Sequence, residues 1–124
     1  MSEFLTTFTS DLKDNLAGFI GVSVTEVKTG MSFASLSVNP NFDPELASAY
    51  NLEVVKAKLS AIKALGLASK LDDILITLSD QLHIIDLSEN GDYFVYLAVD
   101  SSKVNLGMAR ATLKKYSKDI ASKM

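Results

Sequence analysis

His83 is the only histidine of the chain, and it is the first residue to consider for metal or acid–base chemistry. It lies inside a strand-like run, where Asp80 and Asp86 are the nearest carboxylates. Both lie an odd number of positions away, so an extended strand would point them to the opposite face. A second histidine and cysteine are absent, which removes the usual zinc ligands. We therefore expect His83 to be a packed or partly exposed sheet residue, with no metal and no cofactor bound.

Asp72 and Asp73 resemble the paired carboxylates of acid–base catalysts. They precede a strand-like run, however, and adjacency does not make two carboxylates converge on a substrate. We interpret them as solvated loop or capping groups. No serine lies in a G-x-S-x-G turn, and Gly18 and Gly21 lack the context of a phosphate-binding loop. We expect no catalytic residue and no enzyme activity.

Arg110 is the only arginine, so any arginine finger for a GTPase would have to be this residue. Its place early in a helix that we expect to pack on the sheet favours a structural role. Lysines crowd the last helix at Lys114, Lys115 and Lys118, with Lys123 beyond. A solvated face is the simpler interpretation, and a docking patch for an acidic partner or a membrane surface is the alternative.

The chain has 124 residues and a net charge of −3, without cysteine. This length suits one domain with its own core, and we expect a single domain over residues 1–124. The negative net charge gives no evidence of nucleic-acid binding, which usually rests on clustered lysine and arginine. The longest apolar runs are far shorter than the roughly 20 residues of a membrane helix, and the start lacks a secretory signal. We expect a cytoplasmic protein that does not insert into membranes.

A long central helix, from Asp43 to Gly66, is the element around which the rest is organised. Asp43 can cap its first turn, Pro44 suits the first helical position, and Gly66 can adopt the left-handed closing conformation. The helix has two apolar stripes, and a surface helix needs only one. One stripe holds Leu52, Val55, Leu59 and Ile62, which suit a sheet; the opposite one holds Leu46, Tyr50, Val54, Ala57, Ala61 and Leu65. The second stripe indicates either a partner or a helix buried inside a three-layer domain.

The remaining elements follow from periodicity and turn residues. We expect a first helix from Ser2 to about Leu16 and a last helix from about Asn105. Strand-like runs cover 19–28, 31–38, 74–79, 82–87 and 93–100. The second run, MSFASLSV, contains no proline or charge, and such unguarded edges tend to pair with another strand. Apolar residues on both sides of the later strands imply a sheet that is covered on both faces.

The order of elements is helix, two strands, helix, three strands, helix. With the GFIGVSVTEVKTGMSFASLSV hairpin, the long helix and the closing YFVYLAVDSSKVNLGMARATLKK, the chain resembles the roadblock/LC7 family over nearly its whole length. The resemblance implies an α/β (α+β) fold: a profilin-like α/β/α sandwich with a five-stranded antiparallel sheet in the order second, first, fifth, fourth, third. It also implies that the first and last helices share one face, and that two subunits join through their second strands and central helices into a ten-stranded sheet.

What the resemblance implies for function is a non-catalytic homodimeric regulator or scaffold. Its paired central helices would form a platform for a small Ras-like GTPase. The alternatives are a structural adaptor like the dynein light chains and a small-ligand sensor. The expected homodimer interface comprises Ser32, Phe33, Ala34, Ser35, Leu36, Leu46, Tyr50, Val54, Ala57, Ala61 and Leu65, and the expected partner-binding residues are Glu53, Lys56, Lys58 and Lys63.

Overall fold

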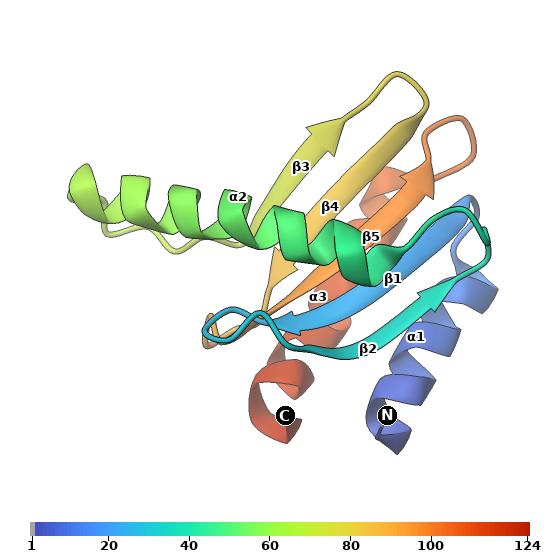
Figure 1. Cartoon of the computed structure of the whole chain (residues 1–124), viewed down its shortest axis with the longest axis horizontal. Helices are drawn as coiled ribbons and strands as arrows, with labels where there is room; N and C mark the ends of the chain where they lie inside the picture. Colours follow the sequence, from blue (N-terminus) through green and yellow to red (C-terminus); the bar gives the residue numbers. More distant parts are fainter. Residues whose placement is uncertain (1) are drawn as a thin grey trace.

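A five-stranded antiparallel sheet forms the centre of the protein, and the computed structural model describes residues 2–124. Its strand order is β2-β1-β5-β4-β3, so β2 and β3 are the two edges (Figure 1). This is the order that the resemblance implied. The strands are β1 (Phe19–Glu26), β2 (Ser32–Ser37), β3 (Asp73–Thr77), β4 (Gln81–Leu87) and β5 (Tyr93–Asp100).

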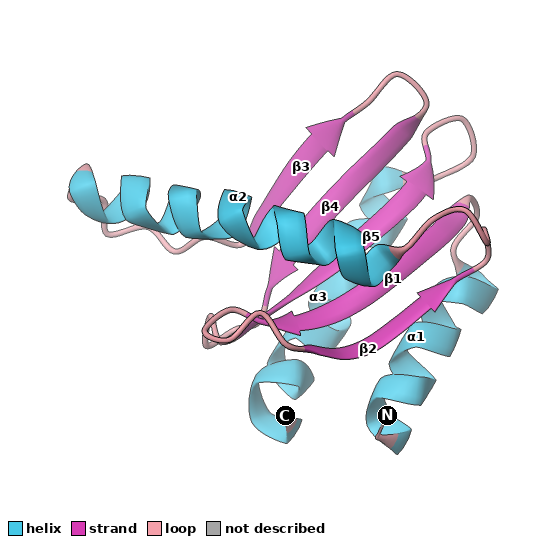
Figure 2. Ribbon diagram, viewed as in Figure 1, coloured by secondary structure: helices cyan, strands magenta, loops and turns pink. Residues whose placement is uncertain are grey.

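Three helices, α1 (Glu3–Asn15), α2 (Pro44–Ala64) and α3 (Leu106–Lys123), cover the sheet. Figure 2 shows α1 and α3 behind the sheet and α2 in front of it. Each helix begins at the expected polar cap. The Ser2 hydroxyl, the Asp43 carboxylate and the Asn105 amide oxygen each accept a hydrogen bond from a free backbone N–H of the first turn.

The sheet has an apolar core on each face because strand residues alternate between the faces. Beneath α1 and α3, Val22 and Leu97 pack with Phe8 and Leu113. Beneath α2, Phe94 and Tyr96 pack with Leu52 and Val55, among others. The lack of clean alternation in the sequence therefore reflects a sheet that is buried on both sides, as expected.

Small residues let α2 and the segment before it lie close to the sheet. The hydroxyls of Ser48 in α2 and Thr25 in β1 form a buried hydrogen bond. Phe42 stacks on Tyr96 with ring centroids 6.4 Å apart. A Cβ atom on Gly21 would come within 2.9 Å of the Phe42 ring, so only glycine leaves room for this stack.

The prediction for the sheet-facing stripe of α2 is right for its first half and wrong for its second. Leu52 and Val55 are buried as expected, but Leu59 is 37% exposed and Ile62 is only partly covered. The physical reason is that α2 is longer than the part of the sheet that it covers. α2 packs on β1, β2 and β5, and its C-terminal half then projects beyond the sheet (Figure 1).

The observed element order, α-β-β-α-β-β-β-α, and the antiparallel sheet confirm the expected fold class. The predicted strand ends are right to within two residues, and the last helix continues to Lys123. Within residues 2–124, no helix combines the length and the apolar character needed to cross a bilayer.

Candidate interaction surface

The open edge of β2 is the first part of the candidate surface. The Val38 N–H donates to the Ile20 carbonyl at 2.9 Å, and Ser23 lies opposite Ser35. Hydrogen-bonded pairs alternate along an antiparallel ladder, so the N–H and C=O of Ser35 point away from β1 toward the open edge. β2 contains neither charge nor proline, and nothing in its sequence protects this edge from pairing.

The five expected interface residues of β2 differ in how far their side chains are available. Ala34 is buried beneath α1 and can contribute only its backbone. Leu36 is half-buried against the same core. Phe33 is exposed at the strand end, where its ring meets that of Tyr93 edge-on at 5.8 Å. Ser32 and Ser35 are half-buried.

The outer stripe of α2 is the second part of the surface. Tyr50 is 74% exposed and Leu65 is 69% exposed, and Leu46 and Val54 are also open to solvent. Ala57 is exposed and Ala61 half-buried between them. Of the two possibilities left by the sequence, the buried helix of a three-layer domain is wrong, because this stripe has no covering layer within residues 2–124. Contiguous exposed apolar residues are typical of interaction sites, so this stripe is a candidate for one.

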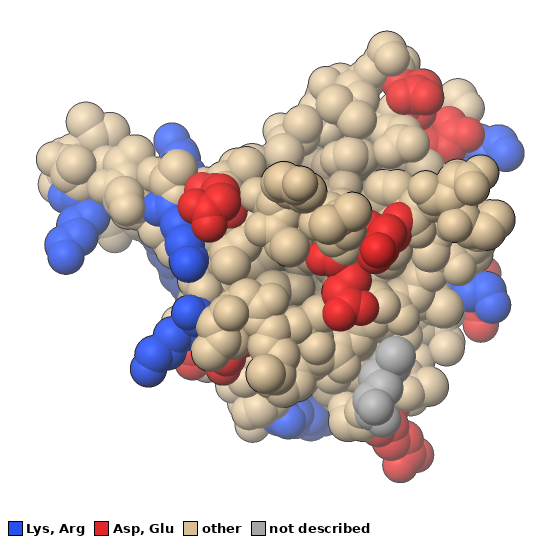
Figure 3. Space-filling model, viewed as in Figure 1, with Lys and Arg blue, Asp and Glu red and all other residues tan. Residues whose placement is uncertain are grey.

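Charged residues flank the stripe rather than interrupt it. Glu53, Lys56, Lys58 and Lys63, the expected partner-binding residues, are all exposed. Among the residues that the structure describes, none of these four takes part in a salt bridge. Figure 3 shows acidic side chains on the front of α2 and basic side chains around its projecting end.

His83 belongs to a hydrogen-bonded row on the α2 side of the sheet, not to a reactive site. Its Nδ1 lies 3.0 Å from the Tyr96 hydroxyl and its Nε2 lies 2.8 Å from Oε1 of Gln81. Burial lowers the pKa of His83, and the charge of Asp80 opposes this shift. The expectation of a partly buried sheet residue is confirmed.

Arg110 is held by Asp73 through two hydrogen bonds, from Nε at 3.1 Å and from an Nη at 3.2 Å. The interpretation of Arg110 as structural is thus confirmed, and that of Asp73 as a solvated loop or capping group is wrong. Asp73 begins β3 and ties α3 to the sheet. Asp72 is exposed, and its Oδ1 lies 3.8 Å from Nζ of Lys114.

The lysines of α3 are mostly neutralised within the chain. Lys114 pairs with Asp72, Lys115 with Asp11 at 4.0 Å and Lys123 with Asp119 at 3.9 Å. These exposed pairs fit the solvated face that was the simpler interpretation of the cluster.

Asp86 is the residue whose role sequence reasoning missed. It lies opposite Asp73 in the sheet and is only 3% exposed, on the α3 side. Burial raises the pKa of Asp86 to about 7, against the favourable charge of Lys114 and with the help of Asp73 and Asp72. The available signal was a lone acid within the apolar run LHIIDL.

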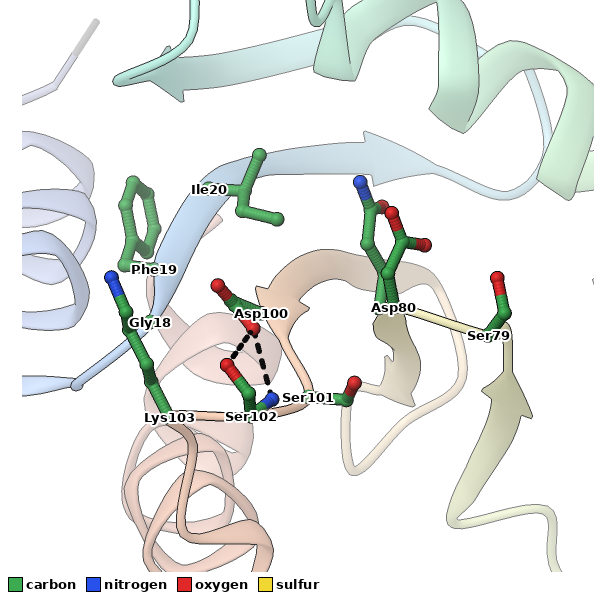
Figure 4. Close-up of a pocket in the computed structure, with 10 residues that line it drawn as sticks. Gly18, Phe19, Ile20, Ser79, Asp80, Asp100, Ser101, Ser102 and Lys103 are labelled. Atoms are coloured by element: carbon green, nitrogen blue, oxygen red, sulfur yellow. Dashed lines mark hydrogen bonds between the residues drawn. The ribbon is translucent and has the colours of Figure 1, made fainter.

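A polar pocket of about 520 Å³ lies at the end of the sheet where β1 begins (Figure 4). The Asp100 carboxylate there accepts hydrogen bonds from the Ser102 N–H at 2.9 Å and the Ser102 hydroxyl at 2.7 Å, which lower the pKa of Asp100. The pocket lies between the β3–β4 turn and the β5–α3 loop, and its exposed members are Ser79, Asp80, Ser102 and Lys103. Its lining is Gly18, Phe19, Ile20, Ser79, Asp80, Gln81, Asp100, Ser101, Ser102 and Lys103.

A sheet covered by two helices on one face and one long helix on the other defines a class of small α/β/α domains. No family model and no curated protein matches the sequence. Solved structures do match it over nearly the full length. A roadblock/LC7 domain from Streptomyces avermitilis has a TM-score of 0.79 at 10% identity, covering 94% of this chain and 93% of that one.

Two MglB structures agree. Myxococcus xanthus MglB has a TM-score of 0.76 at 16% identity, with 98% and 96% of the two chains covered. MglB from Thermus thermophilus has a TM-score of 0.78 at 18% identity, with 97% and 87% covered. At such identities the likeness is one of fold, and the chain has the roadblock/LC7 fold.

Proposed function

We propose that this protein is a homodimeric regulator or scaffold that presents paired α2 helices to a small Ras-like GTPase. The observation that carries the proposal is the coincidence of an unguarded β2 edge with an exposed apolar stripe on the neighbouring α2. Two such edges can pair into a ten-stranded sheet while the stripes approach each other across it. The roadblock/LC7 fold supports this arrangement, and one related structure is described as MglB with a tetrameric arrangement.

The interface that we propose joins the β2 edge, Ser32 to Leu36, to the outer stripe of α2. Leu46, Tyr50 and Val54 are its central members, because they lie on the half of α2 that packs over the sheet. Ala57, Ala61 and Leu65 extend the stripe along the projecting half. Substituting a carboxylate into such a contact would bury an unpaired charge, which is strongly unfavourable.

The GTPase partner comes from the family resemblance, and the proposed contacts are Glu53, Lys56, Lys58 and Lys63 beside the stripe. Arg110 is engaged by Asp73, so this chain's one arginine is poorly placed to enter a GTPase active site. We infer that the protein acts by positioning the GTPase's own groups, without catalysis of its own. The cytoplasmic location and the action of residues 1–124 as one domain are part of the same proposal.

The dimer is tested by substitutions on the two sides of α2. Val54→Glu or Ala61→Glu, on the outer stripe, should give folded monomers. Val55→Glu, on the buried side, should damage folding itself, since Val55 is fully buried. Light scattering and thermal melts separate these outcomes, and dimers that survive both outer substitutions would contradict the proposed interface.

The partner is tested by mixing the protein with small GTPases of its source in both nucleotide states. Nucleotide-dependent binding or a changed hydrolysis rate supports the regulator. Stable partners with no nucleotide dependence would instead support the structural adaptor. Absence of binding and of any rate change across all candidates would remove the GTPase from the proposal.

A further inference from the structure

The charged residues of the projecting end of α2 and of the segment after it are all positive. Residues 54–71 contain four lysines and no acidic residue, although the whole chain has a net charge of −3. Figure 3 shows these basic side chains spread around the part of the molecule that stands away from the sheet. The lysines are Lys56, Lys58, Lys63 and Lys70.

These lysines are exposed and carry no salt bridge within residues 2–124. The contrast with α3 is informative, because Lys114, Lys115 and Lys123 each have a carboxylate partner in the chain. The fold therefore pairs the lysines of α3 other than Lys118 and leaves those of the projection available to an external anion.

Aliphatic side chains lie among these lysines. Leu67 is 53% exposed and follows Gly66, whose φ of +68° turns the chain back after the helix. Leu65 beside it is 69% exposed, so the end of the projection carries exposed aliphatic side chains as well as lysines.

The chemistry of this projection distinguishes between two kinds of acidic partner. Protein interfaces are enriched in arginine and aromatic residues and depleted in lysine. Residues 54–71 contain neither arginine nor an aromatic residue. Lysines beside exposed leucines on a helix are instead the pattern of a contact with an anionic lipid surface.

We propose that the projecting end of α2, residues 56–70, binds the surface of anionic membranes. Lysines would lie near the lipid phosphates and carboxylates while Leu67 enters the headgroup boundary. This is a peripheral contact, distinct from a membrane-spanning segment. It shares Lys56, Lys58 and Lys63 with the contact proposed for a GTPase, so a membrane and a GTPase would compete for these lysines.

The first test is sedimentation of the full-length protein with vesicles at about 0.1 M salt. Vesicles with about a third phosphatidylserine should bind it, and pure phosphatidylcholine vesicles should not. Each lysine near such a surface contributes roughly a fivefold factor in affinity. Lys56→Glu, Lys63→Glu and Lys70→Glu together should therefore reduce binding by about a hundredfold or more.

The matched control carries the same change of charge elsewhere: Lys13→Glu, Lys103→Glu and Lys118→Glu. These lysines are also exposed and form no salt bridge with any other described residue. This variant should lose much less affinity than the variant of the projection. Equal losses would show that only overall charge matters and would overturn the proposal.

A second test reports insertion directly. The chain has no tryptophan, so Leu67→Trp introduces a single fluorophore at the end of the projection. Its emission should shift to shorter wavelength with anionic vesicles. An unshifted spectrum, or binding to polyglutamate without binding to vesicles, would assign the projection to a protein partner instead. Val54→Glu, designed to break the dimer, should keep vesicle binding, which separates this proposal from the dimer.

Discussion

At the scale of single residues, Asp86 is a carboxyl group that is almost completely buried on the α3 side of the sheet. Its nearest charged neighbours are Lys114, which favours ionisation, and Asp72 and Asp73, which oppose it. Because the positive charge of Arg110 lies beside Asp73, it weakens the effect of Asp73 on the ionisation of Asp86.

The consequence for stability follows from the raised pKa of Asp86. In the unfolded chain an aspartate titrates near pH 4. Because its folded pKa is about 7, the folded protein holds the proton more tightly, and stability falls as pH rises between these values. Asp86→Asn removes this titration. The unfolding free energy of the variant minus that of wild type should therefore rise by roughly 3 kcal/mol between pH 4 and pH 8.

Urea denaturation of both proteins at several pH values measures this difference. Asp80→Asn, at an exposed position, provides the control and should show no comparable trend. A gap between wild type and Asp86→Asn that stays constant from pH 4 to pH 8 would contradict the assignment.

At the scale of elements, the open edge of β2 leads to a prediction that separates pairing between subunits from folding within one. Ser35→Pro removes an N–H that points to the open edge, and Leu36→Pro removes one that faces Val22 of β1. We expect Ser35→Pro to weaken the dimer while the protomer stays folded. Leu36→Pro should lower the stability of the protomer itself by about 1–3 kcal/mol, because the Val22 carbonyl loses its hydrogen-bond donor.

Size-exclusion chromatography with light scattering, together with circular dichroism, compares the two variants. A Ser35→Pro protein that dimerises as strongly as wild type would contradict pairing of subunits through the β2 edge.

The elements themselves were predictable because their signals are local. Asp43, Pro44 and Gly66 mark the ends of α2, and the β1–β2 hairpin has its turn at Gly30, where φ is +75°. The exposure of Leu59 and Ile62 was not predictable, since helical periodicity gives the direction of a side chain but not the width of the sheet beneath it. The Asp73–Arg110 contact joins residues 37 positions apart, and no local pattern encodes it.

At the scale of the whole molecule, a dimer that forms between folded protomers should make thermal stability depend on concentration. Association that occurs only in the folded state contributes about 1.4 kcal/mol per tenfold increase in protein concentration. For a dimer of this size the Tm should rise by about 2–5 °C per tenfold increase.

Differential scanning fluorimetry or calorimetry over a hundredfold range of concentration measures this slope. The Val54→Glu protein supplies the control, with a Tm that does not change with concentration. A wild-type Tm that is also independent of concentration would mean that association does not stabilise the folded protomer.

The whole-molecule arrangement was expected only through the family resemblance. Hydrophobic patterning alone indicates two-sided burial of strands such as YFVYLAV, but it does not say which strands are neighbours. The order β2-β1-β5-β4-β3 depends on pairing between distant segments, as in the register of Val22 with Leu97.

The projection of α2 beyond the sheet also bears on how long an unassociated subunit survives. The last three turns of α2 receive little packing from their own sheet, and short helical segments are marginal in water. They also contain Lys56, Lys58 and Lys63, each a cleavage point for a trypsin-like protease. A subunit without a partner therefore displays a readily unwound segment that proteases recognise, and association would protect it. The same feature that offers a binding surface would let a cell remove unassembled copies.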